Sequence, residues 1–170
     1  MAQINIQYLK TPYGELILGS HENQLCLCDW RYRKTRGTLD SRLRNQLNAE
    51  FVDTEDRVLA QTRSQLHEYF NRERKNFDIP LLLVGSAFQK KVWQQLLKIP
   101  FGKTISYLQL AEEIGNPQAV RAVASANGAN AISIIIPCHR VIGSNGKLVG
   151  YAGGLKTKAD LLGLEFDLFN

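Results

Sequence analysis

Residues 134–142 say most about the fold and chemistry of this chain, because they place Cys138, His139 and Arg140 inside an otherwise apolar, β-branched run. The three isoleucines at 134–136 predict a buried strand, and Pro137 ends it since proline supplies no amide donor to a ladder. Cys138 then lies where the chain turns. Adjacent side chains on a strand point to opposite faces, so Cys138 and His139 can cooperate only across a turn or through a water.

The residue types at this turn are those of a nucleophilic site. A thiol is a useful nucleophile only as the thiolate, and a free cysteine stays mostly protonated at neutral pH unless a base or a positive charge lies close. His139 can supply the base and Arg140 the charge. The alternative is that Cys138 packs as a small buried hydrophobic residue. The spacing alone leaves both interpretations open.

Composition sets the broad class of the chain. Its 170 residues are 44% hydrophobic, which is enough for a real core in one large or two small domains. No apolar run reaches the roughly 18 residues of a membrane span, and the start lacks a basic segment followed by an apolar one, so we expect a cytoplasmic protein without a membrane segment. Cys26 and Cys28 would point to opposite faces of a strand, which argues against a disulfide framework.

Charge is unevenly distributed along the chain. Residues 1–85 carry 12 basic and 11 acidic side chains, whereas residues 86–170 carry 9 basic and 5 acidic ones, so the second half holds +4 of the net +5. This balance suits a polyanionic partner, although proteins that bind none often carry a similar excess.

The first half predicts a small antiparallel sheet with helices. Alternating apolar residues predict a hairpin over 4–18 and a third strand over 25–30, and helical spacing predicts an amphipathic helix over 56–72 after a cap at Thr54. The basic stretch 31–45 is interpreted as a loop and short helix, either solvated or touching DNA. His21 and Cys26 are two candidate zinc ligands, but a structural zinc site needs four, so we predict no metal. The domain boundary is placed at 84–86.

The second half predicts a helix-turn-helix. Ser86 and Ser106 each open a capping box, predicting helices over 86–99 and 106–114, and Gly115 ends the second one. Asn116 with Pro117 in first helical position predicts a third helix over 117–127. Such a pair is also compatible with plainly packed helices. A last helix is expected over 156–165.

The 117–127 helix has an unusual surface. Its outward positions are expected to be very small, namely Ala119, Ala122, Ser125 and Ala126, with Arg121 as a long cation in the middle. Helix-turn-helix proteins that read the major groove use long polar side chains, which are scarce here. We therefore expect close approach to a minor groove, without strong sequence preference.

These motifs carry a family resemblance. Residues 137–142 (Pro-Cys-His-Arg-Val-Ile), with Arg-Ala-Val at 121–123 and Gly-Tyr-Ala-Gly-Gly at 150–154, resemble the active-site region of the methylated-DNA-protein-cysteine methyltransferases. The resemblance runs from about residue 88 to 165, and the first half matches only loosely. It implies an α/β fold with a ribonuclease-H-like domain over 1–85 and a mostly helical DNA-binding methyltransferase domain over 86–170.

The resemblance also implies an activity. Family members repair DNA by direct reversal: an alkylated base is rotated out of the duplex, and a cysteine, here Cys138, takes the alkyl group from the 6-oxygen of guanine, or from the 4-oxygen of thymine. The transfer is irreversible and needs no cofactor, so each monomer acts once. His139 would deprotonate Cys138 through a water, and Glu165 would orient the imidazole and balance its charge. The hydroxyl of Tyr107 or that of Tyr151 would give a proton to the guanine ring.

The remaining implied roles concern binding. Arg121 would fill the place that the extruded base leaves in the stack, and the small residues of the same helix would face duplex DNA, namely Ala119, Ala122 and Ala126. Asn130 would brace the active-site turn, and Val141 would contact the base through its carbonyl. The loop over the guanine would contain Tyr151, Ala152 and Gly153. Many members have a hydroxyl residue where this chain has Ala152. Two rivals remain: a DNA-damage sensor without a reactive cysteine, against which Cys138 argues, and a cysteine hydrolase that turns over.

Overall fold

The computed structural model describes residues 2–166, and contacts within the chain divide it into two compact units with the boundary between Gly85 and Ser86. Each unit has its own buried apolar side chains. Among the described residues, no helix has both the length and the apolar character needed to cross a membrane.

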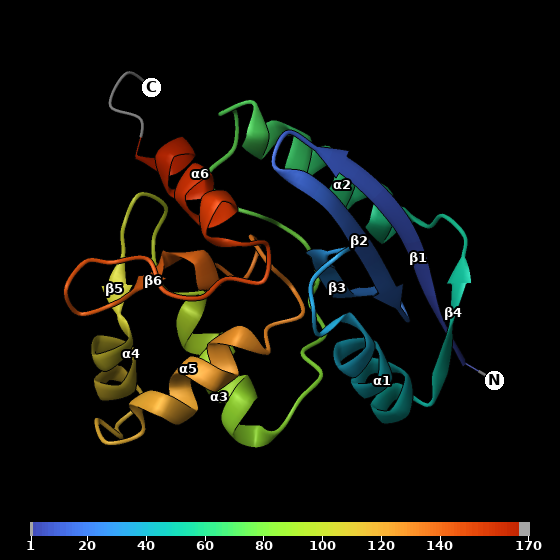
Figure 1. Ribbon diagram of the computed structural model, residues 1–170. Helices are drawn as coiled ribbons and strands as arrows, with labels where there is room; N and C mark the ends of the chain where they lie inside the picture. The colour runs from blue at the N-terminus through green and yellow to red at the C-terminus, as the bar shows by residue number, and fades with distance from the viewer. Residues whose placement is uncertain (1, 167–170) are drawn as a thin grey trace. The chain divides into compact units, whose positions relative to one another are not determined.

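The first unit is built on a four-stranded sheet (Figure 1). Its strands are β1 (Ala2–Thr11), β2 (Gly14–His21), β3 (Gln24–Trp30) and β4 (Ala49–Asp53), in the order β3-β2-β1-β4. The predicted hairpin and third strand are confirmed as antiparallel neighbours. The expected antiparallel sheet is incomplete, because the sequence analysis did not predict β4, which pairs parallel to β1. A parallel neighbour needs a crossover connection, and the chain between β3 and β4 supplies it with a helix.

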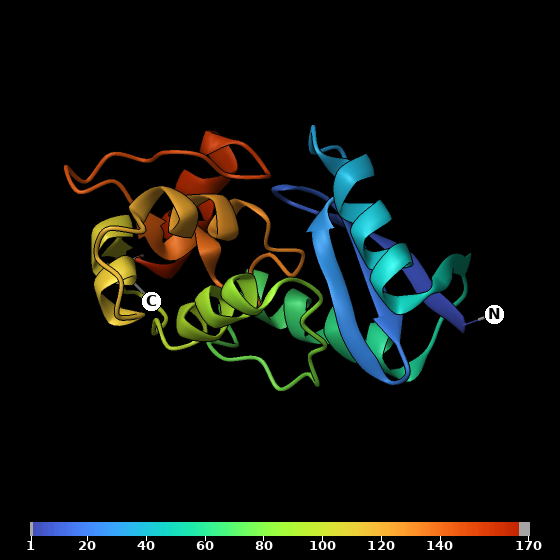
Figure 2. The same cartoon turned by 90° about the horizontal axis from the view of Figure 1, so that it is seen from below.

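Two helices complete this unit, α1 (Arg36–Leu47) and α2 (Arg57–Phe70). Helix α2 lies along the sheet (Figures 1 and 2) and buries Val58, Leu59, Leu66 and Tyr69. The predicted helix is confirmed, but its cap is Asp56, whose Oδ1 accepts from the backbone N–H of Leu59 at 2.8 Å. Thr54 was therefore the wrong cap, since a cap has to sit directly before the first helical residue.

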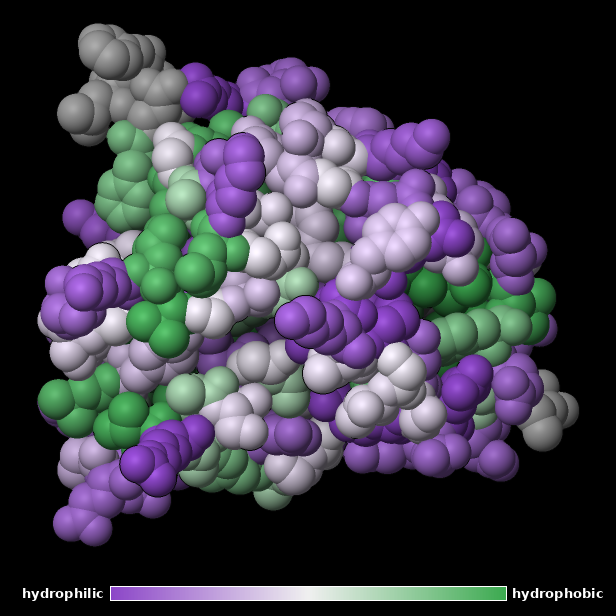
Figure 3. All heavy atoms as spheres, in the orientation of Figure 1, coloured by the Kyte–Doolittle hydropathy of each residue, from purple (hydrophilic) through white to green (hydrophobic). Residues whose placement is uncertain are grey.

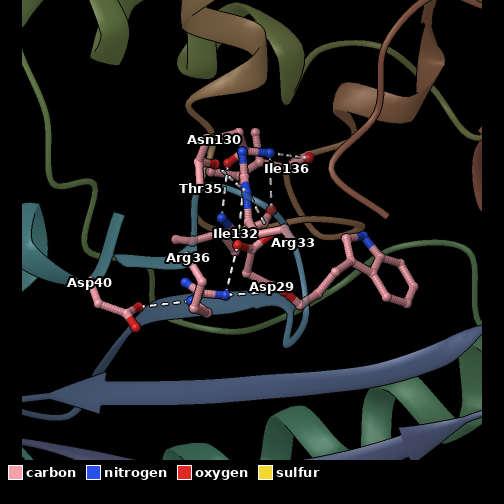
Figure 4. Close-up of polar contacts among 9 residues, drawn as sticks. Asp29, Arg33, Thr35, Arg36, Asp40, Asn130, Ile132 and Ile136 are labelled. Carbon is pink, nitrogen blue, oxygen red and sulfur yellow. Dashed lines mark hydrogen bonds and ion pairs between the residues drawn. The ribbon is translucent and has the colours of Figure 1, made fainter. Parts of the chain in front are cut away.

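Part of the basic stretch 31–45 is neutralised inside the first unit. The fully buried carboxylate of Asp29 accepts from Arg33 at 3.1 Å and from Arg36 at 2.9 Å, and Arg36 also contacts Asp40 at 2.9 Å (Figure 4). Buried carboxylates are stable only when paired in this way. Arg33 and Arg36 thus serve the fold, which leaves fewer free cations here than the sequence suggested.

The second unit is mostly helical. It contains α3 (Ala87–Leu96), α4 (Tyr107–Glu113), α5 (Val120–Gly128) and α6 (Leu155–Glu165), with two-residue parallel strands β5 (Ile105–Ser106) and β6 (Val141–Ile142). Both predicted capping boxes are confirmed: the Ser86 and Ser106 hydroxyls accept from the backbone of Gln89 and Gln109. The helix-turn-helix is the pair α4 and α5, and Gly115 lies in its turn at a φ of +83°.

Helix α5 begins later than predicted. Its first residue is Val120, and the backbone N–H of Ala119 donates to Asn116 at 3.0 Å in a preceding turn. The fixed φ of Pro117 suits a turn as well as a first helical position, so the pattern could not separate the two. Inside the unit, Trp93 of α3 donates from Nε1 to the carbonyl of Ala126 at 2.8 Å, which ties α3 to α5.

The isoleucines at 134–136 form turns and no strand, so that prediction was wrong. All three are buried, but Ile134 has a φ of +72°, and the N–H of Ile136 donates back to Ile132 at 3.0 Å. Asn130 takes the place of a strand partner: its carboxamide bonds both backbone groups of Ile132 and, at 2.9 Å, the carbonyl of Ile136 (Figure 4). The apolar run signalled burial, and a side chain satisfies the backbone that a ladder would otherwise pair.

Apolar side chains also reach the surface of the second unit. Figure 3 shows one face of the molecule, where hydrophobic residues form separate patches among hydrophilic ones. The large exposed hydrophobic residues of this unit are Leu97, Leu108, Val149, Leu155 and Phe166. Two of them, Val149 and Leu155, flank the loop that leads into α6.

Candidate active site

Cys138 opens a single turn of 3-10 helix, Cys138–Arg140, directly after Pro137. Cys138 is 5% exposed, and its backbone N–H donates to the carbonyl of Ile136 at 2.8 Å. A tight turn lets consecutive side chains project within one small volume, which an extended strand forbids. Cys138 and His139 are consecutive residues of one such turn, so the opposite-face constraint of a strand does not apply to them.

His139 is fully buried and paired with α6. Its Nε2 lies 2.7 Å from Oε2 of Glu165, and its Nδ1 has no hydrogen-bond partner among the described residues. An ionised carboxylate only accepts, so Nε2 carries the proton and Nδ1 keeps its lone pair. Burial lowers the pKa of His139 and outweighs the opposing pull of Glu165. The imidazole is thus a neutral base with one free nitrogen.

Arg140 lies on the other side of the same carboxylate. Its Nε donates to Oε1 of Glu165 at 2.7 Å, its Nη2 to Oε2 at 3.1 Å, and its Nη1 to the carbonyl of Ile99 at 2.6 Å. Burial alone would raise the pKa of Glu165, but the hydrogen bonds and charges of His139 and Arg140 lower it to about 2. The sequence analysis suggested that the positive charge of Arg140 stabilises the thiolate of Cys138, whereas the guanidinium is paired with the carboxylate of Glu165.

Tyr107 lies at the start of α4 and is linked to the loop after β6. Its hydroxyl donates to the carbonyl of Val149 at 3.0 Å. Burial raises the pKa of the Tyr107 phenol, and a negative charge on Cys138 raises it further. The phenol of Tyr107 is therefore protonated at neutral pH, and its pKa responds to charge on Cys138.

Lys158 is a site residue that the sequence analysis missed. It is fully buried, and its Nζ donates to the carbonyls of Val149 at 3.0 Å and Gly150 at 3.2 Å. Burial lowers the pKa of Lys158, and charge on Cys138 opposes that shift. The available signal was periodicity, because positions 158, 161 and 165 fall on one face of α6.

The loop after β6 carries three predicted residues. The Tyr151 ring meets the His139 ring edge-on, with centroids 6.5 Å apart. Ala152 and Gly153 are half-buried, and their backbone N–H groups make no hydrogen bond within residues 2–166. Val141 is buried in β6, and Gly154 precedes α6 with a φ of +93°. The loop thus offers two backbone N–H groups without a partner among the described residues, directly after Tyr151 in sequence.

The predicted DNA-facing residues are only partly on the surface. Arg121 and Ala122 are exposed on α5, and Ala119 is half-buried just before it. Ala126 is 3% exposed, so its expected place on the outer face was wrong. Ala126 shares the buried face of α5 with Val123 and Asn127, and the Trp93 indole of α3 donates to its carbonyl. No group of three or more His, Cys, Asp or Glu among the described residues could hold a metal ion.

Comparison with known proteins matches both units to one family. Residues 4–83 match the model of the 6-O-methylguanine DNA methyltransferase ribonuclease-like domain, and residues 87–166 match that of its DNA binding domain. A methylated-DNA–protein-cysteine methyltransferase of Mycobacterium leprae is 43% identical, covering 95% of this chain and 92% of the relative. The constitutive enzyme of Bacillus subtilis is 43% identical, with 92% of each covered.

Solved structures agree. The crystal structure of a Mycobacterium tuberculosis O6-methylguanine methyltransferase superimposes with a TM-score of 0.81 at 38% identity, covering 98% of this chain and 94% of the other. A Mycobacterium tuberculosis OGT in complex with DNA gives 0.82 at 38% identity, covering 96% and 93%.

A ribonuclease-like unit joined to a helix-turn-helix unit with a buried Cys-His-Glu constellation defines a class of DNA-binding alkyl-transfer proteins. The chain belongs to the methylated-DNA–protein-cysteine methyltransferase family. It is a DNA repair methyltransferase that acts by direct reversal, and the α/β fold that the resemblance implied is confirmed.

Proposed function

We propose that Cys138 accepts a methyl group from the 6-oxygen of guanine in duplex DNA, in one irreversible step per protein molecule. The observation that carries this assignment is the buried His139–Glu165 contact at 2.7 Å, which leaves Nδ1 of the imidazole that follows Cys138 in sequence without a hydrogen-bond partner among the described residues. A nucleophile whose neighbouring base is oriented by a third group is the general arrangement for activating a thiol.

The transfer begins with the thiol proton. It passes from Sγ of Cys138 through a water to Nδ1 of His139, and Glu165 stabilises the resulting imidazolium. The thiolate attacks the methyl carbon; a carbon–sulfur bond forms as the carbon–oxygen bond breaks, and the electron pair stays on the guanine. Tyr107 gives its proton to the guanine ring and later regains one from His139, so the net products are a thioether and normal guanine.

The surrounding residues hold the base. The free N–H groups of Ala152 and Gly153 support contacts to the 6-oxygen, while Ala152 itself has no hydroxyl to add. Val141 contacts the base through its carbonyl, and Tyr151, whose ring meets that of His139, lies in the loop that covers the base. Asn130 braces the turn that leads to Cys138 through its bonds to Ile132 and Ile136. Methylation would thus proceed in a site whose backbone is already fixed.

DNA is bound by α5 in the minor groove, without strong sequence preference. The exposed, small Ala122 and half-buried Ala119 permit close approach, and Arg121 fills the space left by the extruded base. Ala126 is left out of this surface because it is buried. The likeness to a DNA complex of a Mycobacterium tuberculosis OGT supports duplex DNA as the partner. We assign the activity to a cytoplasmic monomer that uses no cofactor.

Intact-protein mass after incubation with methylated duplex tests this function. One methyl per protein on Cys138 supports transfer, whereas DNA binding without a mass gain supports a damage sensor and release of product with turnover supports a hydrolase. A second duplex carrying 4-O-methylthymine tests the wider substrate range. Cys138→Ser is the matched control, because a serine hydroxyl is far less ionised and should bind DNA without taking the methyl.

A further inference from the structure

Lys158 is a buried cation that takes no part in the chemistry proposed above. It lies near the start of α6 and is 0% exposed. Burying an ammonium is costly unless it is paired, and no carboxylate among the described residues forms an ion pair with Lys158. Its N–H groups therefore have to find other partners.

Those partners are two consecutive carbonyls of the loop that joins β6 to α6 (Figure 1). The Lys158 Nζ donates to the carbonyl of Val149 at 3.0 Å and to that of Gly150 at 3.2 Å. No backbone N–H of the described residues donates to either carbonyl. The segment 151–153, which would cover the base, thus follows a stretch of backbone whose carbonyls are held by side chains.

Tyr107 is a second donor at the same place. Its hydroxyl donates at 3.0 Å to the Val149 carbonyl that Lys158 also binds, and the ammonium lies 5.8 Å from the centroid of the tyrosine ring. A carbonyl oxygen has two lone pairs and can accept both bonds at once. Tyr107 of α4 and Lys158 of α6 therefore meet at one backbone oxygen of the loop.

The Tyr107 hydroxyl cannot serve this carbonyl and the lesion together. It carries one proton, which is directed to Val149 in the structure, whereas the proposed transfer needs that proton at the guanine ring. The hydroxyl therefore has to turn away from Val149 before it can act. Lys158 then still holds the loop, because an ammonium has three N–H bonds for the two carbonyls.

We propose that Lys158 is a positioning residue for methyl transfer, which holds the two loop carbonyls so that the loop stays over the base while the Tyr107 hydroxyl turns to the guanine. This rests on the proposed function, in which Tyr107 gives that proton. Without the ammonium, the Val149 carbonyl and the guanine compete for the single proton of Tyr107. Losing a hydrogen bond from a charged group corresponds to a rate loss of about 10- to 100-fold.

The first test compares two methyl donors on Lys158→Met, which keeps the length of the side chain and removes its N–H groups. One donor is duplex DNA with 6-O-methylguanine, which needs the loop and Tyr107; the other is methyl iodide, which needs only the thiolate. Both single-turnover rates are read by mass on the peptide that contains Cys138. The rate with duplex divided by the rate with methyl iodide cancels any change in thiol ionisation, and we expect this ratio to fall about 10- to 100-fold.

The matched control is Lys156→Met. Lys156 lies two residues earlier on α6, is exposed and pairs with Asp160 at 2.8 Å. Its replacement removes the same charge from the same helix and should leave the ratio within about twofold of the wild-type value. A ratio equally close to wild type for Lys158→Met would overturn the proposal. Lys158→Leu carries the same comparison if the methionine variant folds poorly.

Chymotrypsin cleavage after Tyr151 tests whether Lys158 holds the loop when Tyr107 does not. Proteolysis follows the population of the open segment, so Lys158→Met should be cleaved there about 10-fold faster than wild type. Tyr107→Phe should be cleaved at about the wild-type rate, because Lys158 still binds both carbonyls. Equal cleavage rates for the two variants would overturn the proposal. Failure of the proposed function itself would be seen separately, as wild-type protein that takes no methyl from the duplex.

Discussion

The imidazole of His139 and the carboxylate of Glu165 lie 2.7 Å apart with both side chains fully enclosed. Arg140 holds the same carboxylate from its other side. A charged acceptor that cannot move and cannot be protonated near neutral pH fixes one tautomer of the histidine. This relationship makes Nδ1, and not Nε2, the nitrogen available to the thiol.

Removing the base should slow methyl transfer. We expect His139→Ala to lower the single-turnover rate with methylated duplex by about 10²- to 10⁴-fold at pH 7, since a positioned general base contributes about that much. Raising the pH should restore part of the rate, because hydroxide then generates the thiolate directly. Quench-flow measurement of methyl transfer at several pH values checks this.

The matched control is His67→Ala, an exposed histidine on α2 in the first unit. It should react at the wild-type rate throughout. If His139→Ala also reacts at the wild-type rate at pH 7, then another group activates Cys138.

Stability should fall in acid because of the same pair. The pKa of Glu165 lies at about 2, lowered from 4.5, so its ionised form adds about 3 kcal/mol that is present above pH 4.5 and is lost as the pH falls toward 2. The pKa of His139 is lowered from 6.5 by burial, so the unfolded chain takes up that proton first and stability already declines below pH 6.5. Urea denaturation from pH 8 to pH 3 measures both effects.

Glu165→Gln serves as the control for this pH dependence. The variant should be less stable at pH 7 and should lose less stability than wild type between pH 5 and pH 3. A pH profile identical to that of the wild type would show that the carboxylate is not the titrating group.

Arg121 should affect the rate of methyl transfer from duplex DNA but not from the free base. Arg121→Ala is expected to slow repair of methylated duplex by about 10-fold or more, since a few kcal/mol of unstacking go uncompensated, while reaction with free 6-O-methylguanine stays unchanged. Arg57→Ala, an exposed arginine at the start of α2, is the control for the lost charge. Equal losses of rate with duplex and with free base would show that Arg121 does not take the place of the extruded base in the stack.

Asn130 should be needed for stability as well as for the site. Asn130→Ala leaves the N–H of Ile132 and the carbonyls of Ile132 and Ile136 without their side-chain partner. The two carbonyls keep backbone donors, the N–H groups of Ile136 and Cys138, so only the buried N–H of Ile132 is left unpaired. One unpaired buried group costs about 1–3 kcal/mol, and we expect the free energy of unfolding to drop by about that much. Asn145→Ala, which breaks a comparable bond to Lys147 in an exposed turn, should cost less than about 1 kcal/mol. Similar losses for both variants would contradict the bracing role.

Local chemistry made much of this fold predictable. The capping boxes at Ser86 and Ser106 depend only on residues within one turn, and the structure forms both. The 134–136 run was misassigned because its backbone is satisfied by Asn130, a partner that no periodicity reveals. Lys158 was missed for a related reason. Its buried ammonium donates to the backbone carbonyls of Val149 and Gly150, and a sequence pattern does not show where backbone carbonyls will lie.

The central claim is that Cys138 accepts one methyl group and is never regenerated. A thioether offers water no good leaving group, so the protein has no chemical route back to the thiol. Mixing protein with excess duplex containing 6-O-methylguanine should give a single rise to about one methyl per protein and then a plateau, with the added mass on the peptide that contains Cys138. Continued repair past equivalence, or methyl on Cys26 or Cys28, would contradict the account.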